Sequence, residues 1–484
     1  MVSMASMHPV VGFDLDLTLV DSADGIVRTM EETGRRFGRS FSRDEIRAQI
    51  GYPLPQTTGL LFGAELADEA AAVYRELYPE LGVPGTTLLP GVTETMAAVR
   101  GHGGSVVVVS AKTPPLIEAH LDALCLQADA VVGDAFGEDK GVAIQEHGVQ
   151  VFVGDHPGDM VGGSVGGATS VGVTTGPHGG AVLQAAGADV VLGTLADFPE
   201  WLDGFVLEAR LGALAERLRE LESVAVAFSG GADSAFLLAA AVRALGTERV
   251  LAVTAVSPSL PRRELLAARE FAGELGVRHV HPRTDELSRD GYRANDGDRC
   301  YFCKAELMDV VRPLAEREGF ADVATGTNAD DAVAGFRPGI RAASERGAVT
   351  PLWDAALTKA QIRVASRSWG LATADKPAAA CLSSRVAYGV AITPEGLARV
   401  DRAETALREL LRDAGITVEN LRVRDVGDDR ARIEVDQPAV PHVARLATVE
   451  AAVLETGFKH VEVDPDGFRS GAMNELLPDP SRFR

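Results

Sequence analysis

The segment Ser229-Gly230-Gly231-Ala232-Asp233-Ser234 decides the fold of the second half of the chain. It follows the apolar run 223–228 and precedes the apolar run 235–238, so a buried strand is predicted to end at the two glycines and a helix to begin there. The free N–H groups at the start of that helix point into the turn and favour a pyrophosphate or a phosphate chain. The spacing matches neither the dinucleotide fingerprint nor the Walker loop, which ends in Gly-Lys-Ser or Gly-Lys-Thr.

The composition limits the classes of protein to consider. The chain has 484 residues, more than one core usually organises, so we expect two or three domains. A formal net charge of -22 argues against a dedicated nucleic-acid surface, because phosphate contacts need a basic face. Only four cysteines are present, no apolar run reaches the ~20 residues of a membrane helix, and the start lacks the charged region of a signal peptide. We therefore expect a cytoplasmic protein without nucleic-acid or membrane partners.

The first half alternates strands and helices, which is typical of a parallel α/β sheet. Strands are predicted at 10–14, 105–110, 131–132, 151–153 and 170–173. The helical stretch of about 22–88 interrupts this alternation and is predicted to be a cap over the sheet. A helix rich in Leu, Ala, Arg and Glu follows near residue 200, and we place the first domain at 1–204.

The second half begins again with strand, anion loop and helix, and further alternation predicts another α/β domain over 205–390. Period-two strands at 421–424 and 431–435 follow an amphipathic helix at 395–412. We expect these to form a small α+β, substrate-binding extension over 391–484.

Two pairs of carboxylates follow predicted strands of the first half. Asp14 and Asp16 lie two positions apart, so they share one side of the backbone at the end of a strand, where α/β sheets bind ligands. One carboxylate can attack phosphorus while the other serves as acid and base. Asp155 and Asp159 follow a later strand and are suited to Mg²⁺.

Ser110 and Lys140 lie between these pairs, and either side chain can hold a phosphoryl oxygen. In this order the residues resemble the four motifs of a haloacid-dehalogenase-type phosphatase with a helical cap, similar to phosphoglycolate phosphatases, over about residues 8–200. The resemblance implies a HAD-like Rossmannoid fold and Mg²⁺-dependent hydrolysis of a phosphate ester. The implied roles are nucleophile for Asp14, general acid and base for Asp16, phosphoryl binding for Ser110 and Lys140, and Mg²⁺ binding for Asp14, Asp155 and Asp159.

Two features depart from that family's pattern. Leu17 stands where glycine is common, and only about fifteen residues separate Lys140 from Asp155, so Lys112 is a reserve candidate for the phosphate lysine. A catalytically idle domain, or a regulatory domain that only binds a phosphometabolite, is the alternative to an active phosphatase.

The cysteines of the second half are Cys300 and Cys303, which form a CxxC motif, and Cys381. Their spacing leaves three possibilities open: part of a zinc site, a [4Fe–4S] cluster with one exchangeable position, and buried thiols. Cys125, in the first half, has no partner and is predicted to be a buried core residue.

The neighbourhood of these cysteines closely resembles the LarE family of ATP-dependent sulfur transferases. The resemblance rests on the loop 229–234 and on the segments 298–304, 326–331, 337–339, 376–385 and 467–471. It implies a PP-loop ATP pyrophosphatase fold, of the adenine nucleotide alpha hydrolase-like type. It also implies adenylation of a carboxylate on a pyridinium-dicarboxylate mononucleotide, followed by replacement of the activated oxygen with sulfur. The product is the thiocarboxylate of the nickel-pincer nucleotide cofactor of lactate racemase.

The resemblance implies one of two sulfur sources. Some members of the family sacrifice a single cysteine, here Cys381, which becomes dehydroalanine. Members with three cysteines hold a [4Fe–4S] cluster whose free iron carries the transferred sulfide. Because Cys300, Cys303 and Cys381 are all present, we expect the cluster.

The remaining predicted ligands surround an ATP and an anionic substrate. We expect the pyrophosphate of ATP to be held by Ser229, Gly230, Gly231 and Ser234, and Mg²⁺ by Asp233. The cations predicted to face the anionic substrate, together with the neighbouring hydroxyl of Ser384, are Arg385, Arg422 and Arg424. Glu404 and Glu434 lie in segments similar to the family's substrate region, although a solvated face is an equal alternative for each.

The main hypothesis is a two-domain enzyme that inserts sulfur and hydrolyses a phosphate ester. A PP-loop enzyme that thiolates tRNA is the alternative for the second half. The expected partners are a small-molecule nucleotide substrate, a second copy of the chain, and a sulfide donor or other proteins of cofactor biosynthesis.

Overall fold

The computed structural model describes residues 8–333, 337–377 and 380–469. It divides into two compact units, with the division between Ala209 and Arg210, inside the long helix α10 (Phe198–Glu220). None of the helices in these described stretches is long and apolar enough to cross a membrane.

Unit 1 is built on a six-stranded parallel sheet in the order β5-β4-β1-β6-β7-β8. Its strands are β1 (Val10–Phe13), β4 (Ser105–Val109), β5 (Ala130–Val132), β6 (Val151–Gly154), β7 (Thr169–Val173) and β8 (Val190–Leu192). The helices that follow the strands are α5 (Val92–Gly101), α6 (Pro114–Ala123), α7 (Glu138–Glu146), α8 (Pro157–Gly166) and α9 (Gly180–Ala185). Because helices flank both faces of the sheet, its inner strands β1, β4, β6 and β7 are rich in valine and almost entirely buried, whereas the edge strands β5 and β8 are half-buried.

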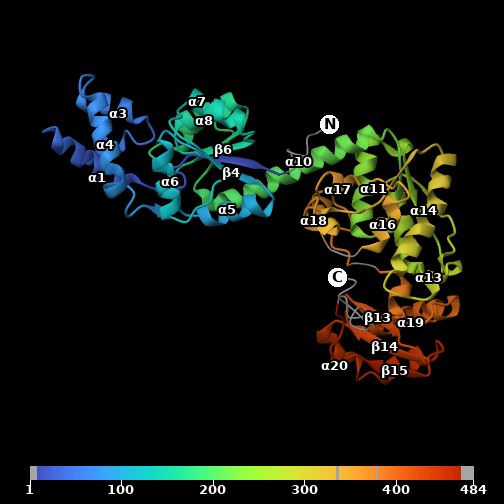
Figure 1. Ribbon diagram of the computed structural model, residues 1–484. Coiled ribbons are helices and arrows are strands. Elements are labelled where there is room, and N and C mark those ends of the chain that lie inside the picture. The colour runs from blue at the N-terminus through green and yellow to red at the C-terminus, as the bar shows by residue number, and fades with distance from the viewer. Residues whose placement is uncertain (1–7, 334–336, 378–379, 470–484) are drawn as a thin grey trace. The chain divides into compact units, whose positions relative to one another are not determined.

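Separate apolar clusters cover the two faces of this sheet. On one face, α5, α6 and α10 pack against Phe13, Val108 and Val153. On the other, α7 packs against Val107 and Phe152, and α8 lies beside α7 (Figure 1). The haloacid-dehalogenase-like α/β fold expected for the first half is confirmed.

The predicted cap is a set of four helices inserted after β1. They are α1 (Ala23–Arg36), α2 (Arg43–Arg47), α3 (Leu54–Phe62) and α4 (Ala67–Leu81), and the antiparallel pair β2 (Val20–Asp21) and β3 (Thr87–Leu88) leads into and out of them. The cap has its own core, which includes Val27, Met30, Phe62 and Tyr78.

Unit 2 contains a four-stranded parallel sheet in the order β11-β10-β9-β12. Its strands are β9 (Val224–Ala227), β10 (Val250–Val253), β11 (Arg278–Val280) and β12 (Asp322–Ala324). The principal helices are α11 (Ala232–Leu245), α12 (Arg262–Glu274), α14 (Arg299–Arg317), α16 (Pro338–Ser344) and α18 (Lys359–Ser368), with shorter α13 (Asp290–Arg293), α15 (Ala329–Val333) and α17 (Pro351–Asp354) between them. Helices α14 and α16 pack on one face of the sheet, and α11 contacts both β9 and α18.

The end of unit 2 is the predicted α+β element. Helix α19 (Pro394–Asp413) packs on a three-stranded sheet of β13 (Leu421–Asp425), β14 (Arg430–Val435) and β15 (His460–Val463), with α20 (Val440–Val443) and α21 (Ala447–Leu454) before the last strand. The helix and the first two strands were expected at nearly these positions.

The prediction that Cys125 is a buried core residue is wrong. Its side chain is exposed and its φ is +54°, because it follows the last residue of α6 at the point where the chain turns back at the surface.

Candidate active sites of the two units

The first site lies where the central strand β1 ends. The Asp14 N–H donates to the Val153 carbonyl oxygen at 2.9 Å, which continues the pairing of β1 with β6 and fixes the start of the following turn. Leu17 has a φ of +56°, a conformation that costs a side-chain-bearing residue about 1–2 kcal/mol. The turn therefore requires a left-handed backbone, which glycine would adopt without this cost, and Leu17 adopts it nonetheless.

Three buried carboxylates and one lysine meet in this turn. Lys140 Nζ donates to Asp14 Oδ1 at 2.7 Å and to Asp159 Oδ1 at 2.5 Å, and Thr18 donates to Asp155 at 3.0 Å. Ligand oxygens of Asp14, Asp155 and Asp159 all lie within 4.8 Å of one another. Oxygen-only donors at such spacing fit Mg²⁺.

The charges of these buried carboxylates favour a bound cation. Burial, together with the charges of Asp159 and Asp16, raises the pKa of Asp14 to about 7 despite the opposing effect of Lys140. Burial likewise raises the pKa of Asp155 well above its usual value, with Asp159 and Asp14 adding to the effect. A divalent ion among these carboxylates would favour their ionised forms.

The two lysines considered for phosphate binding have different neighbours. Lys140 contacts Asp14, whereas Lys112 forms an ion pair with Asp16 and lies 4.9 Å from the centre of the Tyr78 ring. Burial alone would raise the pKa of Asp16, but Lys112 and a hydrogen bond from Ser22 outweigh it and the pKa is lowered.

A cavity of about 320 Å³ opens over this site between the cap and the sheet of unit 1. Asp14, Asp16, Ser110 and Lys112 line its inner end. The sequence predicted the cap but not which of its side chains face the cavity, because that depends on how the cap helices are rotated against the sheet. The cap residues that do so include Tyr52, Tyr74 and Arg75.

The second site is the anion loop after β9. Gly230 has a φ of +73°, and Gly231 is the residue before α11, so the chain turns there as the sequence predicted. The hydroxyls of Ser229 and Ser234 lie 3.1 Å apart, and Lys376 Nζ donates to the Gly230 carbonyl oxygen at 2.8 Å.

Charged residues surround Asp233 behind this loop. Burial raises its pKa, while Lys359 opposes that effect and Asp331 adds to it. Lys359 in turn donates to Asp331 at 3.1 Å. A Cβ on Gly326 would lie 2.9 Å from the Ser234 backbone nitrogen. Position 326 therefore approaches the loop so closely that only glycine fits there without a shift of the backbone.

The three thiols of unit 2 interact with one another. Cys300 and Cys303 lie one turn apart at the start of α14, and Cys381 precedes the short 3-10 helix η5 (Leu382–Arg385). Burial raises the pKa of Cys303, and the charges of Cys381, Glu286 and Cys300 raise it further. Cys300 interacts with Cys381 as well. The three thiols therefore lie within range of one another's charges, although their sulfur atoms are not all within 4.8 Å of one another.

Arg299 links the two segments that carry these thiols. Its guanidinium donates to the Ser383 carbonyl oxygen at 2.9 Å and to the side chain of Asn295. Tyr292 also contacts the hydroxyl of Ser383. Arg299 and Ser383 lie in segments that sequence reasoning had singled out, but no role was assigned to either, and Asn295 and Tyr292 were missed.

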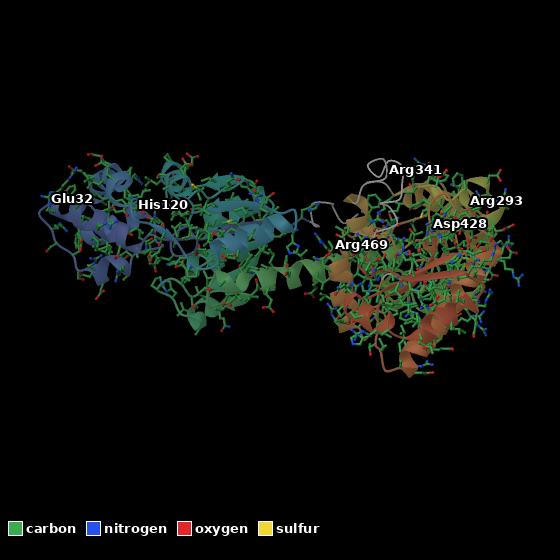
Figure 2. All side chains as sticks on the ribbon, turned by 90° about the horizontal axis from the view of Figure 1, so that it is seen from below. Glu32, His120, Arg293, Arg341, Asp428 and Arg469 are labelled. Carbon is green, nitrogen blue, oxygen red and sulfur yellow. The ribbon has the colours of Figure 1, made fainter. Side chains whose placement is uncertain are left out.

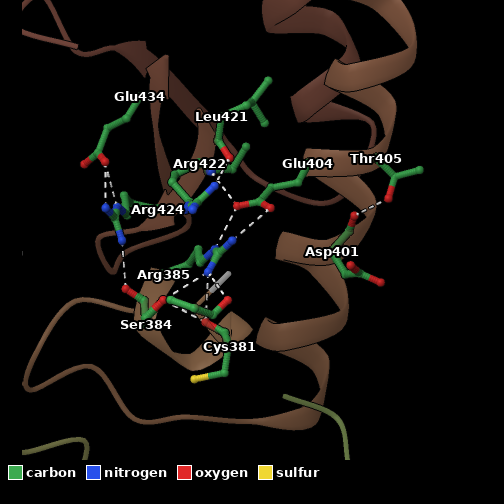
Figure 3. A network of polar contacts seen from close by, with 12 residues as sticks. Cys381, Ser384, Arg385, Asp401, Glu404, Thr405, Leu421, Arg422, Arg424 and Glu434 are labelled. Atoms are coloured by element: carbon green, nitrogen blue, oxygen red, sulfur yellow. Dashed lines mark hydrogen bonds and ion pairs between the residues drawn. The ribbon is translucent and has the colours of Figure 1, made fainter. Parts of the chain in front are cut away.

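A network of arginines and glutamates adjoins Cys381 (Figure 3). Arg385 is fully buried and pairs with Glu404 at 2.9 Å, and it also donates to the Cys381 carbonyl oxygen at 3.0 Å. Arg424 makes two hydrogen bonds to Glu434, at 2.9 and 2.7 Å, and one to the Ser384 carbonyl oxygen at 2.9 Å. Figure 3 shows the Cys381 side chain pointing away from Arg385, on the far side of its own carbonyl group.

Arg422 completes this network. Burial lowers its pKa to about 10, with Arg385 contributing and Glu404 opposing. Its guanidinium lies 5.3 Å from the centre of the Phe468 ring. Glu404 and Glu434 are both buried, so the solvated-face alternative for them is wrong.

Comparison with known proteins gives matches to both halves. The haloacid dehalogenase-like hydrolase family model matches residues 11–163. A protein of Dickeya dadantii described as "Probable phosphatase IndB" is 32% identical over 211 residues, which are 40% of this chain and 92% of that protein.

Two further relatives cover more of the chain. The uncharacterized protein slr1717 of a Synechocystis strain is 39% identical over 275 residues, 56% of this chain and 99% of its own. The pyridinium-3,5-bisthiocarboxylic acid mononucleotide synthase of Lactiplantibacillus plantarum is 34% identical over 272 residues, 56% of this chain and 96% of its own. The chain belongs to the LarE family and carries a haloacid dehalogenase-like hydrolase domain.

In this LarE-family chain the two sets of predicted site residues form two separate groups. Unit 1 brings together Asp14, Asp16, Ser110, Lys140, Asp155 and Asp159. In unit 2 the charge of Cys381 acts on Cys300 and Cys303, and the Cys381 carbonyl oxygen accepts a hydrogen bond from Arg385 of the arginine network. Ala378 and Ala379 of the LarE-like segment 376–385, and Ser470 and Gly471 of the segment 467–471, lie outside the described residues.

Proposed function

We propose that unit 2 uses ATP to adenylate a carboxylate of a pyridinium-dicarboxylate mononucleotide and then replaces the activated oxygen with sulfur. The relative from Lactiplantibacillus plantarum is named for the bisthiocarboxylic acid product of such a reaction. The observation that supports the proposal is the position of Cys381, whose charge acts on the other two thiols and whose carbonyl oxygen accepts from the buried Arg385.

The residues of unit 2 suit the two steps. The backbone N–H groups of Gly230 and Gly231, with the hydroxyls of Ser229 and Ser234, would hold the pyrophosphate of ATP. Asp233 would serve the Mg²⁺ that bridges the phosphates. Arg422 and Arg424 would face the anionic substrate, and Arg385 would orient Cys381 through its carbonyl oxygen, because the Arg385 guanidinium is already paired with Glu404.

The three thiols suit a [4Fe–4S] cluster better than a zinc ion. Thiolates around one tetrahedral zinc lie roughly 3.8 Å apart. Within the described residues, only the carboxylates of unit 1 form a trio of metal-binding side chains with all ligand atoms inside 4.8 Å. The sulfur atoms of Cys300, Cys303 and Cys381 are not all within 4.8 Å of one another, but their charges interact. This arrangement suits an iron–sulfur cluster, which is larger than a single metal ion. Such a cluster, held by three thiolates, offers one iron to an exchangeable sulfide.

Unit 1 is proposed to hydrolyse a phosphate monoester. An Asp14 carboxylate oxygen attacks phosphorus, the bond from phosphorus to the ester oxygen breaks, and the leaving alcohol takes a proton from Asp16. Water then hydrolyses the aspartyl-phosphate, with Asp16 as base. Lys140 and Ser110 would hold the phosphoryl oxygens, and Mg²⁺ bound by Asp14, Asp155 and Asp159 would neutralise their charge.

The experiment for unit 2 is anaerobic purification, followed by iron and acid-labile sulfide analysis and by incubation with ATP and the dicarboxylated pyridinium mononucleotide. We expect protein-bound iron, AMP and a thiocarboxylate product. Formation of ADP and phosphate in place of AMP would contradict the adenylation. An iron-free protein whose Cys381 loses two hydrogens and one sulfur on turnover would replace the cluster by a sacrificial cysteine.

A further inference from the structure

We propose that the cavity of unit 1 takes a phosphate monoester whose alcohol part carries an aromatic ring with a carboxylate, as in a mononucleotide with an acidic base. This inference rests on the proposed phosphatase activity of unit 1. It concerns the part of the substrate that lies beyond the phosphoryl group, which the four catalytic motifs do not touch.

The size and lining of the cavity favour a ring-sized, largely apolar alcohol part over a small polar one. At about 320 Å³ it lies within the range of cavities that hold ring-sized ligands. A two-carbon acid would leave most of this volume unfilled. The side chains beyond the carboxylate end are largely apolar and come from the cap, with one from helix α6: Ile26, Met30, Ile46, Ile50, Leu54 and Leu116. Such a surface favours an apolar body of matching size.

Aromatic rings form part of the wall of this cavity. The Tyr52 ring lies 5.8 Å from the Phe136 ring and 4.6 Å from the His156 ring, so the three support one another. Tyr52 and Phe136 both line the cavity, as does Tyr74. A planar ring can stack on such a wall, and a ring with a positive charge gains further from the faces of the aromatic side chains.

Arg75 supplies the charge that selects the carboxylate. It lies on α4, lines the cavity, and makes no hydrogen bond or ion pair with another residue in the described part of the chain. The other cation at the cavity, Lys112, is already paired with Asp16. An unpaired guanidinium at the edge of an apolar cavity favours a carboxylate, which it can hold through two hydrogen bonds.

The reaction balances with water alone. The bond between phosphorus and the ester oxygen breaks, the alcohol leaves as a nucleoside with one proton, and water supplies the oxygen of the released phosphate. The substrate proposed for unit 2 is itself a pyridinium mononucleotide with carboxylates on its ring. The inferred substrate of unit 1 therefore belongs to the same chemical class as a reactant or product of the proposed sulfur insertion.

The test compares phosphate release from nicotinic acid mononucleotide and from nicotinamide mononucleotide, which differ only in a carboxylate against an amide. We expect kcat/KM to be about tenfold higher for the acid, the size of one charge-assisted hydrogen bond. Arg75→Gln should abolish that preference while retaining turnover of nicotinamide mononucleotide. Arg35→Gln, which changes an exposed arginine of the cap that pairs with Glu32, should leave the preference intact.

Three results separate the outcomes. Equal rates for the two mononucleotides, or a higher rate for phosphoglycolate than for either, would overturn the inference. Absence of turnover for every ester, p-nitrophenyl phosphate included, would count against the phosphatase activity instead. In that case calorimetric titration of the full chain with both mononucleotides still decides the inference, because equal affinities for the acid and the amide would overturn it.

Discussion

Arg385 is fully buried, whereas most arginines in proteins are exposed to solvent. Its side chain has no exposed surface, pairs with Glu404 and donates to backbone carbonyl oxygens at Ala380 and Cys381. A buried guanidinium needs all of these partners, since each unpaired buried charge carries a large desolvation cost. The pair therefore holds helix α19, strand β13 and the segment of Cys381 in one arrangement.

Replacing Arg385 alone should destabilise unit 2 strongly. Arg385→Met leaves Glu404 buried without its main partner, and we expect the free energy of unfolding to fall by about 3–5 kcal/mol. Urea unfolding followed by tryptophan fluorescence measures this. The double variant Arg385→Met with Glu404→Leu should recover most of the loss. Arg412→Met, at an exposed arginine, should change little, and an equal loss there would contradict the argument.

At the scale of single elements, the anion loop depends on one backbone conformation. Gly230 has a φ of +73°, and a Cβ there would lie 3.3 Å from the Cβ of Ala268 on α12. The turn therefore directs its N–H groups into the loop only if this position can adopt the left-handed region.

Gly230→Ala should weaken ATP binding by roughly tenfold, because the left-handed conformation costs about 1–2 kcal/mol with a side chain. Calorimetric titration with ATP and Mg²⁺ measures the change. Gly204→Ala, in helix α10 where a Cβ meets no atom within 4 Å, serves as the control and should leave ATP affinity unchanged. An unaltered affinity of Gly230→Ala would show that this loop does not bind the phosphates.

The contact between cap helix α4 and helix α6 contains a buried histidine, so its stability is expected to depend on pH. His120 on α6, labelled in Figure 2, is fully buried, and its Nε2 lies 3.1 Å from the hydroxyl of Tyr78 on α4. Burial lowers the pKa of His120 to about 4, with Lys112 adding to the effect.

The contribution of His120 to the stability of unit 1 should therefore rise with pH between about 4 and 6.5. The raised pKa values of Asp14 and Asp155 act in the opposite direction, so a variant of His120 is needed to isolate this contribution. In this window the unfolded chain binds a proton at His120 and the folded chain does not, so protonation favours unfolding by up to about 3 kcal/mol at the acid end. Thermal unfolding at a series of pH values measures it. His120→Gln keeps a hydrogen-bonding side chain without the titration, so its stability relative to the unaltered protein should increase as the pH falls from about 6.5 to about 4. Parallel curves would contradict the assignment to His120.

The whole molecule consists of two units, each with its own buried core and its own candidate active site. Because the residues of the two sites belong to different compact units, a local change at one should not alter the chemistry of the other.

Asp14→Asn should lower the hydrolysis of p-nitrophenyl phosphate by roughly 10³-fold or more, since it removes the attacking carboxylate. AMP formation from ATP should stay within about twofold of the unaltered protein. Gly230→Ala should lower AMP formation from ATP and leave the hydrolysis of p-nitrophenyl phosphate within about twofold of the unaltered protein. If either variant lost both activities while remaining folded, the two sites would be coupled and the assignment of separate functions would fail.

The sequence by itself determined the features that depend on neighbours along the chain. The loop 229–234, the carboxylate pairs after two strands and the period of helix α19 were predictable because glycine conformation, strand ends and helical spacing are local. The order of the motifs then predicted which fold each half would adopt.

Only the tertiary structure decided which charges meet. Lys112 and Lys140 both follow strands of the same sheet, but the first reaches Asp16 and the second Asp14. Arg385 was predicted to face the substrate but is enclosed with Glu404, and Arg75 faces the cavity although nothing near it in the sequence distinguishes it from other arginines. Such contacts depend on the rotation of helices against a sheet, and the free energy that fixes this rotation comes from the packing of the whole core.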